Sequence, residues 1–135
     1  MNAITTSAVT LTATYAGALA LGYACLSLIV IRARRRQGVS LGNGGDPLLE
    51  RLIRGHGNFG EYVPFALLLM LLLELSGSSP WLLHGVAAAL ILGRGLHSYA
   101  LLRSGGSPLC RTSGMALTLT SLSVAALGCF SLVFR

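Results

Sequence analysis

The residues most suited to chemistry in this sequence are arginines that recur beside two glutamates at helical spacing. If residues 50–62 form a helix, six of their polar side chains fall within an arc of roughly 120°. These side chains are Glu50, Arg51, Arg54, Asn58, Glu61 and Tyr62. Arg94 and His97 are three positions apart, which places them on one face of another helix. A guanidinium group grips a carboxylate or phosphate through two parallel N–H donors. The pattern therefore predicts a site for a small anion.

Long apolar runs must position these residues. The sequence predicts helices over about residues 9–31, 47–75, 80–102 and 111–133, each long enough to cross a bilayer. Only 10% of the 135 residues are charged and 53% are hydrophobic, whereas a soluble domain is about 25% charged. We therefore expect an all-α fold, a bundle of four transmembrane helices that occupies residues 1–135 as one domain.

The distribution of basic residues predicts how these helices are oriented. Four arginines, at positions 32, 34, 35 and 36, follow the first apolar run, and Arg103 and Arg111 flank the loop between the third and fourth. The remaining loop and the N-terminal tail contain no basic residue. The positive-inside rule places both basic loops in the cytoplasm and both termini outside. Glu74, toward the other side, is expected to extend to the outer membrane surface.

The polar groups of all four runs converge at the cytoplasmic level. Lipid cannot solvate them, because each charge at mid-bilayer costs at least about 2.5–3.5 kcal/mol, so they must pair or line a wet cavity. One possibility is structural, with ion pairs between Glu50 and Arg54 and between Arg54 and Glu61, and with the loop arginines on lipid headgroups. Bases outnumber acids at that depth, however, and this surplus favours a cavity that binds an anion.

Two other classes of site are disfavoured. The net charge of +6 comes from ten arginines that flank or enter apolar runs and form no solvated basic surface, so we expect no nucleic-acid partner. Cys25, Cys110 and Cys129 are isolated and make no metal-binding spacing with the three histidines. No metal site and no disulfide framework are therefore predicted, and the role of Cys110 stays open.

The stretch from Glu50 to Phe65 resembles the signature of the MAPEG family, the membrane-associated proteins in eicosanoid and glutathione metabolism. The shared pattern on the second helix is E-R-x-x-R-x-H-x-N-x-x-E-x-x-P. The similarity extends to Arg94-Gly95-Leu96-His97 and to the arginine run after the first helix, so it covers nearly the whole chain. Within the family, the chain most resembles a YecN-like bacterial inner-membrane branch, for example at Ser113-Gly114-Met115.

The resemblance implies a single MAPEG-like membrane domain that forms a homotrimer and binds glutathione between subunits near the cytoplasmic face. It implies catalytic roles for Arg111, which would steady the thiolate, and for Arg35, at the position of a proton donor. A family tyrosine expected four residues after His97 is Leu101 here, so that contact is lost unless Tyr99 substitutes. The glutathione contacts that it implies are Arg34, Arg51, Arg54, Asn58, Glu61, Tyr62, Arg94 and His97.

Two functions stay open on this basis. The first is a glutathione S-transferase or peroxidase that acts on a lipophilic small molecule dissolved among the membrane lipids. The second is binding of glutathione or of a lipid headgroup without turnover. A transporter is disfavoured, because small multidrug exporters of similar length need a carboxylate in the first helix, and here no charged residue precedes Arg32. Both functions place the protein in the bacterial inner membrane, with the site on the cytoplasmic side.

Overall fold

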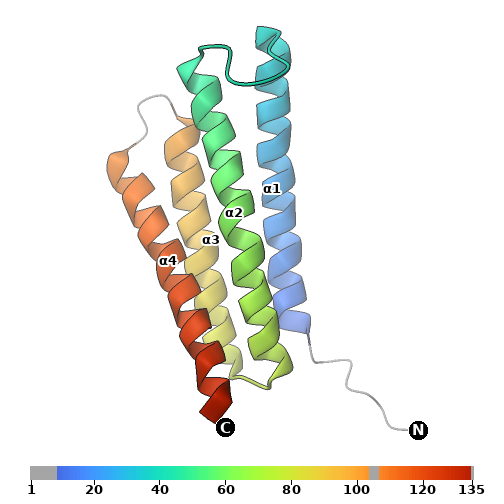
Figure 1. Ribbon diagram of the computed structural model, residues 1–135, viewed down its shortest axis with the longest axis vertical. Helices are drawn as coiled ribbons and strands as arrows, with labels where there is room; N and C mark the ends of the chain where they lie inside the picture. Colours follow the sequence, from blue (N-terminus) through green and yellow to red (C-terminus); the bar gives the residue numbers. More distant parts are fainter. Residues whose placement is uncertain (1–8, 104–106, 135) are drawn as a thin grey trace, which may run out of the picture.

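The computed structural model describes residues 9–103 and 107–134. The helices run antiparallel side by side, so the first helix begins at the same end of the bundle at which the fourth ends (Figure 1). In the described residues, four helices are long and apolar enough to cross a membrane, which confirms the predicted all-α bundle of four membrane-spanning helices. The elements are α1 (Thr10–Gln37), α2 (Pro47–Leu75), α3 (Pro80–Leu102), α4 (Pro108–Ser131) and a short 3₁₀ helix η1 (Leu132–Phe134).

Proline and capping residues explain where the helices begin and end. Pro47, Pro80 and Pro108 open α2, α3 and α4, where the N–H group that proline lacks has no helical acceptor in any case. The Asp46 carboxylate accepts two backbone N–H groups of the first turn of α2, as an N-cap does. At the end of α1, Gly38 takes a left-handed conformation with φ of 66°, which terminates a helix at little cost for glycine.

Two helices differ from the predicted ranges. The sequence predicts that the first helix ends near residue 31, but α1 continues to Gln37 and includes the whole arginine run. Arginine is a good helix former, so the charges end the apolar stretch without ending the helix. The fourth helix starts at Pro108 instead of about residue 111, and ends at Ser131. The ranges of α2 and α3 agree with the prediction.

The helices α3 and α4 pack with their backbones in contact. A Cβ atom added to Gly93 would lie 2.8 Å from the carbonyl oxygen of Gly114, and one added to Gly114 would lie 2.6 Å from the backbone nitrogen of His97. Such distances leave no room for any side chain at either position. Small residues allow this close approach of helices within membranes. The contact fixes Arg94 and His97 of α3 against the first half of α4.

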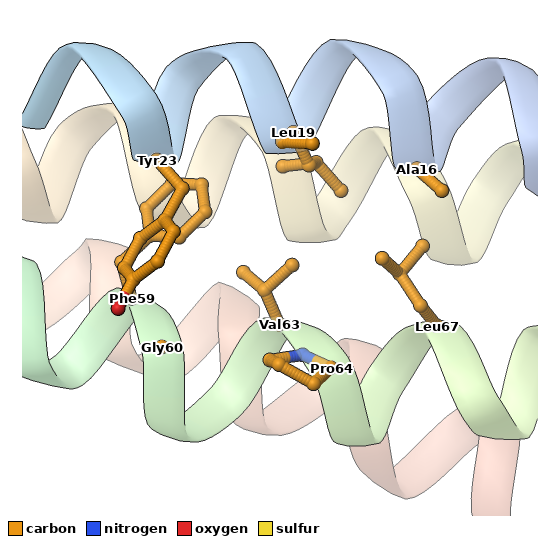
Figure 2. Close-up of a pocket in the computed structure, with 9 residues that line it drawn as sticks. Ala16, Leu19, Tyr23, Phe59, Gly60, Val63, Pro64 and Leu67 are labelled. Atoms are coloured by element: carbon orange, nitrogen blue, oxygen red, sulfur yellow. The ribbon is translucent and has the colours of Figure 1, made fainter. Parts of the chain in front are cut away.

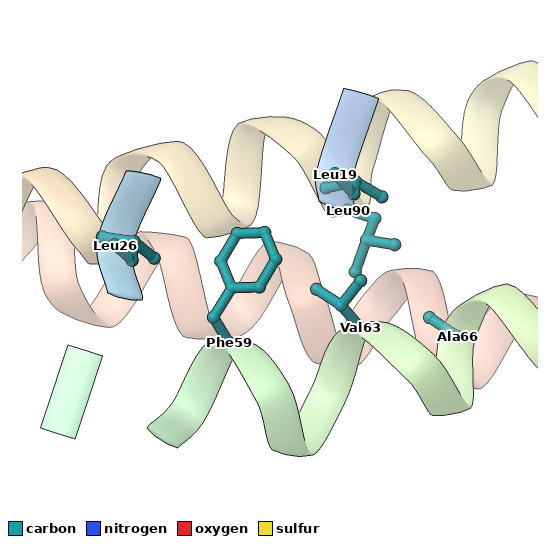
Figure 3. Close-up of a cluster of buried hydrophobic side chains, with 6 residues drawn as sticks. All are labelled: Leu19, Leu26, Phe59, Val63, Ala66 and Leu90. Atoms are coloured by element: carbon teal, nitrogen blue, oxygen red, sulfur yellow. The ribbon is translucent and has the colours of Figure 1, made fainter. Parts of the chain in front are cut away.

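Two clusters of buried apolar side chains hold the remaining helices together. The first joins α1, α2 and α3 near the middle of the bundle (Figure 3), and the second joins α2, α3 and α4 nearer the end where the chain begins. In the most apolar stretch of α1 only 11% of residues are buried, against 44% in α3. Thus α3 is central and α1 peripheral. The first cluster consists of Leu19, Leu26, Phe59, Val63, Ala66 and Leu90.

The side chain of Glu74 ties the start of α1 to the bundle. Its Oε1 accepts the backbone N–H of Leu11 at 2.8 Å and its Oε2 accepts that of Thr12 at 2.7 Å. The helix α1 has no side-chain cap of its own, so Glu74 satisfies N–H groups that lack helical acceptors. The hydroxyl of Tyr15 and Nδ1 of His84, 2.6 Å apart, add a second tie. Glu74 is half-buried at this end of the bundle, and its extension to the outer membrane surface stays a prediction.

Candidate functional site

A polar cavity of about 530 Å³ opens at the arginine-rich end of the bundle, between α2, α3 and α4. Its charged lining consists of three arginines and one glutamate, so the cavity is positive on balance. Its volume lies within the range of small-molecule sites, roughly 300–1,000 Å³. The cavity lies at the end of the bundle where the register of the helices places the predicted site. The lining residues are Pro47, Glu50, Arg51, Arg54, Asn58, Leu101 and Arg111.

A second recess of about 410 Å³ adjoins the cavity and shares part of its wall. The shared residues are Arg51, Leu101 and Arg111, and the recess adds Arg103 and Thr112, among others. Arg51 of α2 and Arg111 of α4 thus stand between two hollows that open at the same end. Both hollows are therefore lined by basic side chains.

His97 holds Asn58 in place behind this cavity. Nδ2 of Asn58 lies 3.0 Å from Nε2 of His97, and Nδ1 of His97 lies 3.3 Å from the carbonyl oxygen of Arg111. A carbonyl oxygen can only accept, so the pattern assigns the proton to Nδ1 and leaves Nε2 to accept the Asn58 amide. His97 is itself buried. It therefore orients Asn58 and the first turn of α4, and does not face the cavity.

Arg94 is a buried guanidinium without an acidic partner. Its side chain is 2% exposed, and Nε donates to Oγ1 of Thr118 at 2.9 Å while Nη1 donates to the carbonyl oxygen of Asn58 at 3.4 Å. The guanidinium also lies over the ring of Tyr62, 5.3 Å from its centroid. No carboxylate pairs with it in the described residues. Arg94 does not line the polar cavity, and its donors support Thr118 and the backbone of Asn58, which does line it.

The other arginines of the cavity are available for a ligand. The side chains of Arg54 and Arg111 have no hydrogen-bond or ion-pair partner in the parts of the chain that the structure describes. Nε of Arg51 is buried and also lacks a partner there. The structure does not form the ion pairs that a purely structural role would require, between Glu50 and Arg54 and between Arg54 and Glu61. The predicted surplus of unpaired guanidinium groups is therefore present in this cavity.

Some predicted residues lie outside the cavity of the single chain. Arg34 and Arg35 line a separate recess at the end of α1, where Nη1 of Arg34 donates to the carbonyl oxygen of Gly42 at 2.7 Å. The helix α1 packs against α2 and α3 but not against α4, so these arginines share the level of the cavity without facing it. Glu61 is exposed farther along α2, and Tyr62 packs against Arg94 instead of lining the cavity.

Thr118 is a supporting residue that the sequence analysis did not single out. It is fully buried, accepts from Arg94, and donates its hydroxyl proton to the carbonyl oxygen of Gly114 at 2.8 Å. A hydroxyl in the middle of an apolar helix can indicate such a supporting residue, because a buried hydroxyl needs a hydrogen-bond partner. Residues with such a hydroxyl are frequent in this helix, however, and the sequence does not show which of them meets the arginine.

The recess between α1 and α2 has a different character. It encloses about 300 Å³ and contains no charged side chain. Figure 2 shows Leu19 and Tyr23 of α1 facing Phe59, Val63 and Leu67 of α2 across it. It lies within the membrane-spanning parts of both helices and is unsuited to an anion. In residues 9–103 and 107–134, no three His, Cys, Asp or Glu side chains gather as a metal site requires.

Known proteins resemble this chain over about half of its length. Inner membrane protein YecN of Escherichia coli strain K12 is 41% identical over 73 residues, which cover 54% of this chain and 56% of that protein. The protein of the same name from Escherichia coli O6:H1 strain CFT073 gives the same identity and coverage, so the alignment spans about half the length of each relative. The sequence profile of the MAPEG family matches residues 12–131, which include the whole cavity lining. The chain belongs to the MAPEG family.

Proposed function

We propose that this protein binds glutathione in the polar cavity and uses its thiolate to conjugate or reduce lipophilic electrophiles from the bilayer. The observation that supports this best is the unbalanced charge of the cavity, in which Arg51, Arg54 and Arg111 face one acidic residue, Glu50. Glutathione carries two carboxylates and one ammonium group, which suits such a set of side chains. The MAPEG family, to which the chain belongs, includes glutathione-dependent enzymes.

Each side chain of the cavity has a role in this proposal. Arg51 and Arg54 grip the carboxylates, while Glu50 is placed to accept the ammonium group. Asn58, held by His97, orients the peptide part. Arg111 stabilises the negative sulfur, because an adjacent guanidinium lowers the pKa of a thiol. The thiolate then attacks the electrophilic atom of an acceptor, and the leaving group departs with the electrons of the broken bond.

A neighbouring copy of the chain would complete the site, and we propose a homotrimer. One face of α2 stays exposed although α2 is a well-packed helix, and Arg54, Glu61, Leu68 and Leu75 follow one another along it at intervals of seven residues. A second subunit on this face would cover Glu61 and the apolar residues. It would also bring its own Arg34 and Arg35 toward the cavity, which the single chain does not do.

The proposed location is the bacterial inner membrane, with the cavity on the cytoplasmic side. The support is the name of both relatives, inner membrane protein, together with the arginines gathered at the end of the bundle that holds the cavity. The positive-inside rule retains such loops in the cytoplasm. Glutathione dissolved in the cytosol would then reach the cavity directly, and the acceptor would arrive from the membrane.

One observation favours the second candidate function, binding without turnover. Leu101 is 6% exposed and lines the cavity where the family resemblance implies a tyrosine. Tyr99 does not replace it, because Tyr99 is exposed and its hydroxyl accepts a hydrogen bond from Arg103. The cavity therefore lacks one phenolic donor that could stabilise a thiolate, and glutathione could be held there without being activated.

The test is a glutathione titration of the purified full-length protein in detergent. Calorimetry measures binding, and formation of the thioether from a generic aryl halide, or loss of an organic hydroperoxide, measures turnover. Binding with turnover supports the enzyme, and binding without turnover in either assay supports the second candidate. Absence of any binding heat for glutathione, in protein that remains folded by circular dichroism, refutes both.

A further inference from the structure

A second apolar recess lies between α1 and α3, apart from the polar cavity. It encloses about 330 Å³, and its rim residues Cys25, Ile91 and Leu102 are exposed. Both helices are long and apolar enough to cross the membrane, so in a bilayer this groove faces lipid. Phe59 of α2 forms part of its lining. The residues of α1 and α3 that shape it include Gly22, Cys25, Ile29, Ile91, Gly95 and Leu102.

Glycine on both walls keeps the groove open. A Cβ atom added to Gly95 of α3 would meet no other atom within 4 Å, and one added to Gly22 of α1 would meet only the ring of Phe59, at 3.7 Å. The α3 wall runs from Ile91 to Leu102, which is about 16 Å of helix. Arg94 borders the groove, but its Nε is directed to Thr118 on α4. The groove thus has the length and apolar lining to hold a hydrocarbon chain.

Two arginines extend the α1 wall of the groove beyond its apolar end. Positions 18, 22, 25, 29, 32 and 36 follow one another at intervals of four and three, so they fall within an arc of about 80°. Arg32 and Arg36 therefore continue the face of Ile29, roughly one and two turns farther on. By the same geometry Arg34 and Arg35 project about 140° and 120° away from Ile29. The arginine run is thus divided between two faces.

Arg32 and Arg36 are also free to bind a ligand. Both are exposed, and neither has a hydrogen-bond or ion-pair partner among the residues that the structure describes. This distinguishes them from Arg34, whose guanidinium is bonded to the loop after α1, and from Arg103, which is bonded to Tyr99. The groove therefore ends, at the edge of the bilayer, in two guanidinium groups without an anion.

We propose that this groove binds an anionic phospholipid, with one acyl chain between α1 and α3 and the phosphate between Arg32 and Arg36. Guanidinium groups bind phosphate oxygens through paired N–H donors, and basic groups beside membrane spans select anionic headgroups. A zwitterionic lipid offers the same chain, but its own cation competes with the arginines for the phosphate. The site is distinct from the polar cavity, and it does not depend on the protein binding glutathione.

Native mass spectrometry of the full-length protein, titrated with phosphatidylglycerol or with phosphatidylcholine of the same chains, tests the headgroup. Phosphatidylglycerol should bind more tightly. The double variant R32Q/R36Q should weaken its binding by about 30-fold, from the loss of two arginines, and should change phosphatidylcholine binding little. R32K/R36K keeps both charges and should retain most of the preference. R103Q removes a charge from the same end of the bundle and should have no effect.

A second pair of variants tests the position of the acyl chain. Gly95→Leu places a side chain in the groove and should weaken binding of both lipids, while the headgroup preference remains. Gly85→Leu is the matched control on α3, because a Cβ there also meets nothing within 4 Å, and it should bind as the parent does. Equal affinity for the two lipids in the parent overturns the proposal, as does unchanged lipid binding in Gly95→Leu. Equal binding of glycerol phosphate, which lacks acyl chains, also overturns it.

Discussion

The carbonyl oxygen of Gly93 lies 2.7 Å from the point that a Cβ atom on Gly114 would occupy, so α3 and α4 meet backbone to backbone. Residues near these glycines form hydrogen bonds between the two helices. Arg94 bonds to Thr118, and His97 bonds to the carbonyl oxygen of Arg111. Both bonds cross from α3 to α4 and depend on the short distance between the helices. The glycine contact therefore sets the geometry of the site as well as the packing.

Gly114→Ala should destabilise the protein by about 1–3 kcal/mol, the range for overpacking a well-packed site. The atoms in the way are backbone atoms of His97 and Gly93, which cannot move aside as a flexible side chain can. Thermal unfolding in detergent, followed by circular dichroism, measures the effect. Gly85→Ala on α3 is the control, since a Cβ there meets nothing within 4 Å. A melting temperature unchanged in Gly114→Ala would mean that the helices are farther apart.

Arg54→Ala should weaken glutathione binding by about 1.5–3 kcal/mol, the usual loss for a hydrogen bond to a charged group. Arg54 lines the cavity and has no protein partner in the described residues, so its removal leaves no other side chain without a partner and the fold should be unaffected. Calorimetric titration gives the dissociation constant. Arg36→Ala removes an equal charge outside the cavity and should bind glutathione as the parent does. Equal dissociation constants for Arg54→Ala and the parent would refute the assigned role.

Arg111→Ala should separate binding from activation. The cavity keeps Arg51 and Arg54 for the carboxylates, so glutathione should still bind, but the thiol should lose its nearest stabilising cation. The ultraviolet absorbance of bound thiolate should disappear, and turnover of an aryl halide should fall with it. Arg111→Lys retains a positive charge and should restore part of the absorbance. Full thiolate absorbance in Arg111→Ala would assign the stabilisation to another group.

Leu101→Tyr should increase turnover if the missing phenol limits activation of glutathione. Leu101 lines the cavity, and it packs beside Gly55, where a Cβ would lie 3.5 Å from its Cδ1. The cavity offers the open space into which a larger ring at this position can extend. The measurement is kcat for thioether formation, compared with that of Leu101→Phe, which adds the ring without the hydroxyl. Equal rates in the two variants would show that the hydroxyl is not what the cavity lacks.

The level of the cavity in the membrane could be predicted from the sequence, and its outline could not. Hydropathy and length place Arg54 and Arg111 at the same height, because each lies near a helix end set by proline and loop residues. Height does not determine the direction of a side chain. The sequence therefore places Arg34 with them, although α1 and α4 do not pack closely against each other. Which helices are neighbours is decided by packing, here by the close contact at Gly93, and a periodic pattern in one helix does not contain that information.

Two local features could not be predicted from the sequence, each for a simple physical reason. The first feature is the end of α1. Hydropathy falls at the arginine run, which makes the helix seem to end there. Arginine favours helix, however, and α1 ends only before Gly38. The second feature is the capping of α1 by Glu74. Its partners, Leu11 and Thr12, lie about 60 positions earlier in the chain, beyond the reach of any local pattern.

That long separation has a consequence for biosynthesis. The ribosome completes α1 well before it adds Glu74, 63 residues after Leu11. During this interval the leading N–H groups of the first span have no acceptor within the protein, so water or lipid headgroups must satisfy them. Assembly at the translocon therefore has an order, because α1 can settle against the bundle only after α2 has crossed the membrane. A nascent chain released before residue 74 would leave the N–H groups of Leu11 and Thr12 without their carboxylate acceptor.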